Sequence, residues 1–164
     1  MHDMPKRENG LESEEPNRIL KISEKVIKTF EKYEQKEGCS ESGGILLGHV
    51  ARDHVIITEA TTPSRFDFKT IITFVRAKIP AQLRINKAWK KSSGTLIYLG
   101  EWHTHRGINP TPSAQDKTMI LKSLKETKME IDFLYLVVVG INRTYWVGKQ
   151  TKNGLTRVDN FEIN

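Results

Sequence analysis

Two histidines separated by a single residue stand where a strand is expected to end. His103 and His105 follow residues 95–99, whose β-branched and aromatic side chains are typical of a buried strand. Because side chains alternate along a strand, both imidazoles are predicted to project from the same face. Two imidazoles on one face can ligate the same metal ion.

Asp116 is the predicted third ligand. Residues 107–112 contain glycine, asparagine and prolines that cannot continue the strand, and Ser113 is a natural N-cap for a following helix. A carboxylate in the first turn of that helix can turn back toward the histidines. Three nitrogen and oxygen ligands with an open fourth position are typical of a catalytic zinc, whereas structural zinc is usually enclosed by cysteines. The chain has one cysteine, Cys39.

A general base has to come from elsewhere in the chain, and Glu41 is the first candidate. It lies just before the glycine-bracketed apolar residues 43–48, so its carboxylate is predicted at the mouth of a second buried strand. Glu101 is the rival, because it shares the face of His103 and His105 and could act as base or orient a ligand. Its place farther back along the strand, on the core side, ranks it below Glu41.

The glutamate, the pair of histidines, the serine and the aspartate together resemble the complete signature of the JAMM (MPN-plus) metalloprotease family. The first part, the glutamate, precedes a glycine-bracketed apolar strand; a His-Thr-His run follows, then seven residues, a serine, two residues and an aspartate. The resemblance covers about residues 18–150. The matching positions are Glu41, His103, His105, Ser113 and Asp116.

Residues 99–105, together with Pro110 and Pro112, are similar to the small stand-alone bacterial members of that family. They resemble in particular the deconjugating peptidases of type II CBASS anti-phage operons, which act in antiviral defence. Arg106 departs from the pattern, because many relatives have proline there. Arg106 is expected at the edge of the site and is not among the predicted ligands.

These residue types predict hydrolysis of an amide or isopeptide bond with one catalytic Zn2+ ion. His103, His105 and Asp116 would hold the zinc, which lowers the pKa of water toward neutrality. Glu41 would take the proton of the attacking water and return it to the leaving amine. Ser113 would donate a hydrogen bond to the developing oxyanion.

The resemblance also implies a protein substrate with an extended C-terminal tail. The tail would belong to a ubiquitin-like protein or to a cGAS-like nucleotidyltransferase that has been joined to a target. Relatives clamp such tails, often by strand addition. Pathway proteins similar to ubiquitin-activating and ubiquitin-conjugating enzymes are then expected as partners. A deubiquitinase-like or sulfur-carrier-processing peptidase of another bacterial pathway fits the same motif.

Composition predicts one domain of ordinary size. The chain has 164 residues, contains no run of eighteen apolar residues, and begins with a polar lead of mixed charge. We therefore expect neither a membrane span nor a signal peptide, and a cytoplasmic location. The lone Cys39 agrees, because it permits no intramolecular disulfide.

The net charge of +6 raises the question of nucleic acid. The lysines are spaced along expected amphipathic helices, which favours a solvated face or a basic rim for an acidic protein partner. They form two groups: Lys87, Lys90 and Lys91, and then Lys117, Lys122, Lys125 and Lys128.

Two further function classes are open at this point. A DNA-repair-associated, JAMM-like nucleic-acid-binding protein would fit the basic charge. A metal-free MPN scaffold would act only by binding, although such domains typically lack the ligands that are all present here. A zinc base deaminase is excluded, because its cysteine ligands are absent.

The elements that position these residues are expected as follows. Residues 1–16 are predicted to be a disordered lead, and residues 17–164 to form a single JAMM/MPN domain. Apolar residues recur with helical spacing from Asn17 as cap to about residue 36, with Gly38 as the stop. Residues 44–50 and 54–60 read as a hairpin.

Further along the chain, residues 61–69 are expected to be a loop and residues 71–76 a short strand or helical turn. Residues 80–92 are predicted to form a helix with Leu83 and Trp89 on its inner side. Residues 113–128 should form the helix that carries Asp116. Residues 133–140 should form a central strand that pairs with residues 144–149, and the tail from residue 151 is a candidate edge strand. This order predicts an α/β fold with a mixed sheet flanked by helices, and the resemblance implies the cytidine-deaminase-like MPN fold.

Overall fold

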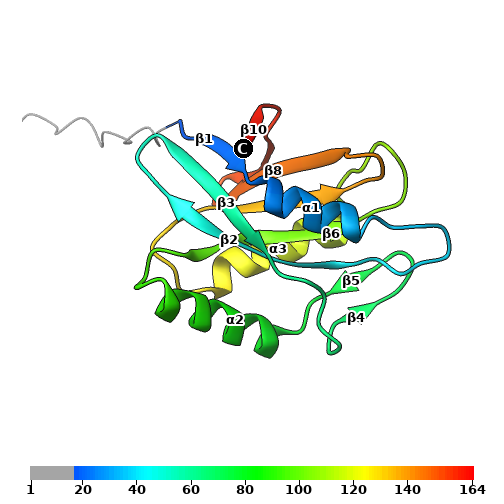
Figure 1. The fold of residues 1–164 in the computed structure, drawn as a ribbon, viewed down its shortest axis with the longest axis horizontal. Coiled ribbons are helices and arrows are strands. Elements are labelled where there is room, and N and C mark those ends of the chain that lie inside the picture. Colours follow the sequence, from blue (N-terminus) through cyan, green and yellow to red (C-terminus); the bar gives the residue numbers. More distant parts are fainter. Residues whose placement is uncertain (1–16) are drawn as a thin grey trace, which may run out of the picture.

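A computed structural model of the chain describes residues 17–164. The disordered lead predicted for residues 1–16 lies outside the described residues. An eight-stranded mixed sheet runs through the domain in the order β10-β1-β3-β2-β6-β7-β8-β9 (Figure 1). Its strands are β1 (Ile19–Ile22), β2 (Gly43–Val50), β3 (His54–Ala60), β6 (Ile97–Thr104), β7 (Leu134–Val139), β8 (Tyr145–Thr151), β9 (Gly154–Arg157) and β10 (Phe161–Ile163).

The helices divide between the two faces of this sheet. Helix α1 (Glu24–Lys32) packs on one face through its buried side chains Val26, Ile27 and Phe30. Helices α2 (Lys78–Lys91) and α3 (Ala114–Glu126) pack on the other face. Each face therefore has its own apolar core, and the sheet lies between them.

Strands β7 and β6 lie inside the sheet and form its most buried part. All six residues of β7 are buried, and β7 pairs in parallel with β6 and antiparallel with β8. This confirms the predicted central strand and its partner. The predicted hairpin is also confirmed, because β2 and β3 pair antiparallel on either side of residues 51–53. The weakly predicted edge strand of the tail is present as β9.

The predicted first helix is wrong at both ends. Residues Ile19–Ile22 form strand β1, which pairs in parallel with β3 and buries Leu20 and Ile22. The helix begins only after Ser23, whose side chain caps it, and ends at Lys32 rather than near residue 36. The apolar spacing of this stretch fits both periodicities, and pairing with β3, which is distant in sequence, selects the strand.

The second predicted helix exists, but its inner face differs from the prediction. Leu83 is 63% exposed and Trp89 is 46% exposed, so neither is a core residue. Ala81, Ile85 and Ala88 face the sheet instead. The two alanines leave room for α2 to lie against β2 and β6.

A small two-stranded sheet precedes α2. Strands β4 (Phe68–Lys69) and β5 (Phe74–Val75) pair antiparallel around residues 70–73. The strand alternative for residues 71–76 is therefore confirmed in part, and the predicted loop over 61–69 ends in β4. None of the helices within residues 17–164 is long and apolar enough to cross a membrane.

Candidate metal centre

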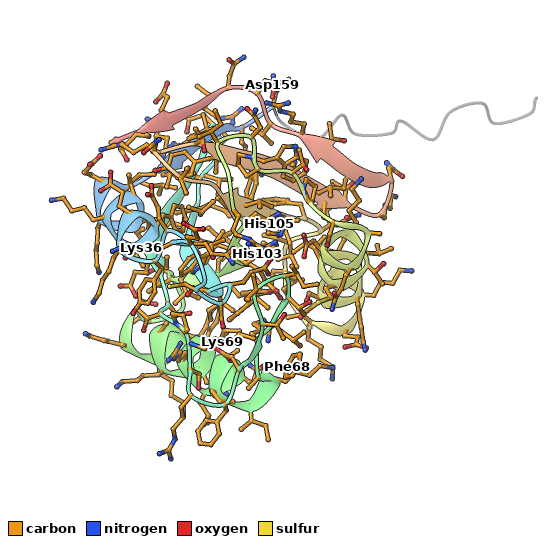
Figure 2. All side chains as sticks on the ribbon, turned by 90° about the vertical axis from the view of Figure 1, so that its right-hand side faces the viewer. Lys36, Phe68, Lys69, His103, His105 and Asp159 are labelled. Carbon is orange, nitrogen blue, oxygen red and sulfur yellow. The ribbon has the colours of Figure 1, made fainter. Side chains whose placement is uncertain are left out.

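The two predicted histidines lie at the carboxyl end of β6. His103 pairs with Gly43 of β2 and Val138 of β7, and the backbone N–H of His105, just past the strand, donates to the Val139 carbonyl at 2.9 Å. Neighbouring strands on both sides thus fix the backbone here. The ring centroids lie 4.8 Å apart, so the structure brings the two imidazoles together as predicted (Figure 2).

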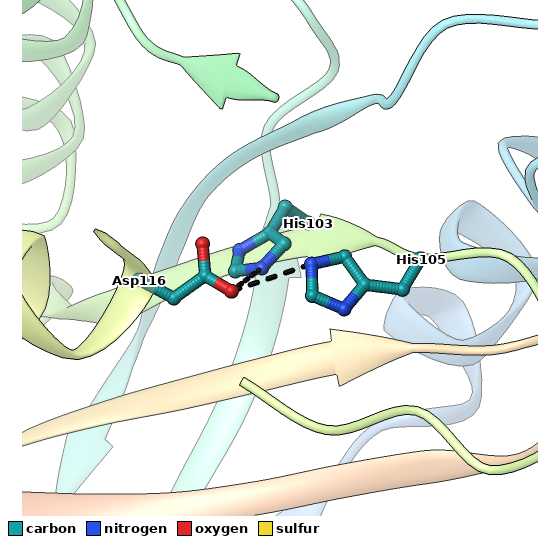
Figure 3. Close-up of side chains that lie close together, drawn as sticks. All are labelled: His103, His105 and Asp116. Carbon is teal, nitrogen blue, oxygen red and sulfur yellow. Dashed lines mark ion pairs between the residues drawn. The ribbon is translucent and has the colours of Figure 1, made fainter. Parts of the chain in front are cut away.

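Asp116 approaches the same point from α3. Ser113 caps this helix: its hydroxyl accepts from the Asp116 N–H at 3.1 Å, and Asp116 Oδ2 accepts from the Ser113 N–H at 2.7 Å. This capping box holds the carboxylate at the start of the helix. Oδ2 lies 3.1 Å from His103 Nε2 and 3.3 Å from His105 Nε2 (Figure 3).

The spacing of these donor atoms fits a tetrahedral metal ion. Ligand atoms about 2.0 to 2.1 Å from a tetrahedral zinc lie about 3.3 Å from one another, which matches the two distances from Asp116 Oδ2. His103 Nε2 is buried, and its contact with Asp116 is not aligned as a hydrogen bond. A buried ring nitrogen without an aligned partner is suited to ligate a metal ion. Within residues 17–164, His103, His105 and Asp116 form the one group of three such side chains that could do so.

The charges of Asp116, His105 and Glu41 influence one another because the side chains lie close together. Burial by itself would raise the pKa of the Asp116 carboxyl, but its interactions with His103 and His105 outweigh burial and hold that pKa well below its usual range. Burial likewise opposes protonation of His105, yet the neighbouring Asp116 and Glu41 carboxylates raise the pKa of its ring. Asp116 therefore keeps its negative charge beside the two imidazoles.

Glu41 also lies close to His105. Its Oε1 is 3.7 Å from His105 Nε2, and its side chain is 6% exposed. Burial raises the pKa of this carboxyl. The backbone around it is held by two contacts: the Glu41 N–H donates to the Thr70 carbonyl at 2.8 Å, and the Ser42 N–H donates to the Thr104 hydroxyl at 2.9 Å. The predicted placement of Glu41 at the mouth of β2 agrees with this geometry.

Ser113 is exposed at the start of α3. Its oxygen accepts the capping hydrogen bond, so the hydroxyl proton is available to a group outside the helix. The structure brings Ser113 close to Asp116, as the spacing predicts. A contact between this hydroxyl and a substrate stays a prediction.

Glu101 occupies a different position from Glu41. Its side chain points to the same face as His103, but its Oε1 accepts hydrogen bonds from Tyr98 Oη, Arg76 Nε and Ser123 Oγ, each at 2.9 Å. This oxygen is therefore already engaged by three side chains. The arrangement favours Glu41 over Glu101 as the proton-transferring group.

Arg76 is the residue of this region that the sequence pattern does not reveal. It follows β5 directly, and its Nη2 lies 2.8 Å from Glu101 Oε1. Burial lowers the pKa of Arg76, but Glu101 and Tyr98 together raise that pKa by more, so the guanidinium keeps its charge. The sequence indicates Arg76 only indirectly, because a buried carboxylate such as Glu101 is usually paired with a cation.

Comparison of the sequence with known families and proteins gives several matches. Residues 23–153 match the prokaryotic homologues of the JAB domain. The chain is 32% identical to a CD-NTase/cGAS isopeptidase of Vibrio cholerae serotype O1 over 116 residues, which cover 71% of each chain. It is also 32% identical to a CD-NTase/cGAS isopeptidase of Escherichia coli over 143 residues, covering 87% of this chain and 88% of the relative.

The fold is shared with a solved structure. The solution structure of a protein from Desulfitobacterium hafniense superposes with a TM-score of 0.62, and the match covers 89% of this chain and 92% of that one. The two sequences are 18% identical, so the likeness concerns the fold.

Proposed function

The chain belongs to the family of prokaryotic JAB-domain proteins, and from this membership we propose that it is a zinc-dependent isopeptidase that removes a conjugated protein from its target. The family assignment confirms the JAMM resemblance and the MPN-type α/β fold expected from the sequence. In the proposal, residues 17–164 form the peptidase domain.

The observation that carries this proposal is the meeting of four side chains from three elements. His103 and His105 come from the end of β6, Asp116 from the start of α3, and Glu41 from the segment before β2. Two imidazoles and a carboxylate would hold the zinc. A second carboxylate close to His105 would serve the reaction.

The bound zinc would supply Lewis-acid chemistry that makes water nucleophilic near neutral pH. Glu41 would accept the proton of the attacking water at its carboxylate. It would then give that proton to the nitrogen of the leaving amine. The Glu41 side chain is buried beside His105, close to the proposed ligands.

Ser113 would stabilise the charge that develops on the carbonyl oxygen. Its hydroxyl proton is available because the capping interaction uses only the oxygen as acceptor. One such donor is typically worth about 3 kcal/mol of barrier lowering. The capping box would thus fix the ligand Asp116 and the donor Ser113 with one local structure.

The proposed substrate is a cGAS-like nucleotidyltransferase joined through its C-terminal tail to a target protein. Support comes from the names of the relatives from Vibrio cholerae and Escherichia coli. Phe74 of the β4–β5 hairpin lines a pocket with His103 and Asp116, and the same hairpin presents the exposed Phe68, which offers an apolar contact for an extended tail. A ubiquitin-like tail would use the same geometry.

A direct test compares cell lysates treated with purified wild type and with Glu41→Ala. Mass spectrometry should find an isopeptide-linked species that disappears with wild type and persists with Glu41→Ala or with a zinc chelator. Zinc content should be equal in the two proteins, because Glu41 is not among the proposed ligands. Full hydrolysis by Glu41→Ala would show that another group is the base. If neither protein changes any conjugate, the peptidase proposal is wrong.

A further inference from the structure

The Glu101 carboxylate joins three structural elements behind the proposed metal centre. Its oxygen Oε1 accepts from Arg76 at the end of the β4–β5 hairpin, from Ser123 on α3, and from Tyr98 earlier on β6. Glu101 itself lies two residues before His103 on the same strand. The side chain is only 12% exposed.

Ser123 connects this carboxylate to the helix that carries Asp116. The two residues are seven positions apart on α3, which is nearly two turns, so they lie on the same face of the helix. The capping box holds one end of this face near the histidines, and the Ser123–Glu101 hydrogen bond holds it two turns later. Together the two contacts fix the direction of α3 relative to β6.

Arg76 connects the same carboxylate to the wall of the proposed catalytic pocket. Phe74, two residues earlier, lines that pocket with His103 and Asp116. The Phe74 ring also packs over Gly43, where an added Cβ would lie 2.7 Å from the ring. Displacing Arg76 would therefore shift a pocket wall.

We infer that Glu101 is a positioning residue, which sets the relative placement of Asp116 and His103 through Ser123 and that of the pocket wall through Arg76. This inference rests on the proposed function of the site. The proposal gives proton transfer to Glu41 and not to Glu101, because Glu101 Oε1 already accepts from three donors. It acts by keeping ligands from two elements in register, which a metal site requires to within about 0.5 Å.

Ser123 offers the sharpest test, because removing its hydroxyl separates α3 from Glu101 and leaves Arg76 paired with the buried carboxylate. Ser123→Ala should bind zinc about tenfold more weakly than wild type, in the range typical for partners that orient ligands. In the same variant kcat should fall while KM stays unchanged. Zinc affinity is measured by competition with a chromophoric chelator and needs no substrate.

Two matched variants separate positioning from a general loss of stability. Ser123→Thr keeps the hydroxyl, and Ser123 lines a pocket of about 980 Å³ with room for one more methyl group, so zinc affinity and kcat should return to wild-type values. Glu126→Gln breaks the exposed Lys78–Glu126 pair, which also joins α2 to α3 but does not involve Glu101. This variant should match wild type.

The inference is overturned if Ser123→Ala keeps wild-type zinc affinity, if Ser123→Thr is as weak as Ser123→Ala, or if Glu126→Gln shows the same loss. Glu101→Gln, which keeps the shape but not the charge, should weaken zinc binding where it folds. If wild type binds zinc but cleaves no conjugate, the proposed function is wrong. The zinc affinities of the Ser123 variants still decide the role of Glu101.

Discussion

Asp116 uses one oxygen for two purposes. Its Oδ2 accepts the Ser113 N–H and also faces both histidines. A helix N-terminus favours a carboxylate in its first turn, because the free N–H groups and the helix dipole are positive there. The cap at the start of α3 therefore also orients the proposed ligand Asp116. Ser113 contributes to the cap and to this orientation.

Ser113 allows the two contributions to be separated. Ser113→Ala should lower stability by about 1 kcal/mol through loss of the cap, and lower kcat roughly 100-fold through loss of the oxyanion donor. Ser113→Gly should cost only a few tenths of a kcal/mol, because glycine is tolerated as an N-cap, yet show the same loss of kcat. Chemical denaturation and steady-state kinetics provide the two readouts. Full activity in Ser113→Gly would contradict the proposed donor.

At the scale of elements, an irregularity in β6 decides which side chains share a face. Leu46 pairs with Gly100 and Leu47 with Tyr98, so Leu99 is an extra residue, a β-bulge. Three residues apart, Tyr98 and Glu101 would face opposite sides of a regular strand. The bulge puts both on the α2/α3 side, where they form a hydrogen bond.

Gly100 makes the bulge possible, and its replacement tests this. Its φ is +145°, and an added Cβ would lie 1.9 Å from the Tyr135 carbonyl oxygen. Gly100→Ala should therefore destabilise the protein by about 3 kcal/mol or more, from overpacking and backbone strain together. Gly38→Ala is the control: its φ is also positive, at +74°, but the space around it is open, so only about 1 to 2 kcal/mol is expected. If the denaturation midpoints of Gly100→Ala and Gly38→Ala fall by the same amount, the close approach of Gly100 to the Tyr135 carbonyl does not affect stability.

At the scale of the whole molecule, the two faces of the sheet have different tasks. The α1 face holds an apolar core in which Phe30 packs against Trp102, with ring centroids 5.1 Å apart. The α2/α3 face bears Glu101 and His103, and the proposed site lies at its end. The large apolar core on the α1 face and the residues of the proposed site thus lie on opposite faces of the sheet.

A core substitution on the α1 face should change stability without changing the metal site. Phe30→Ala should cost about 3 to 5 kcal/mol, because the side chain is fully buried. The protein that stays folded should still bind one zinc ion per chain, as measured by elemental analysis. Leu83→Ala, at a site 63% exposed, should change stability by less than about 0.5 kcal/mol. Loss of zinc from folded Phe30→Ala would argue against this separation.

Local chemistry in the sequence determined the parts of the site. The spacing of His103, His105, Ser113 and Asp116 specifies a strand end, a cap and a first helical turn, all short-range features that residue types control directly. The hairpin of β2 and β3 and the central strand β7 follow from equally local patterns. The choice of Glu41 over Glu101 was also made from sequence, and the geometry supports it.

Only the tertiary structure decided what depends on distant pairing. Residues Ile19–Ile22 are a strand because β3 lies beside them, and Leu83 and Trp89 face outward because the sheet meets the other side of α2. Arg76 reaches Glu101 across 25 positions of sequence, and the bulge at Leu99 turns Tyr98 toward the same carboxylate. Such contacts have no local signal, because the free energy that selects them comes from burial and pairing between segments that meet only in the folded chain.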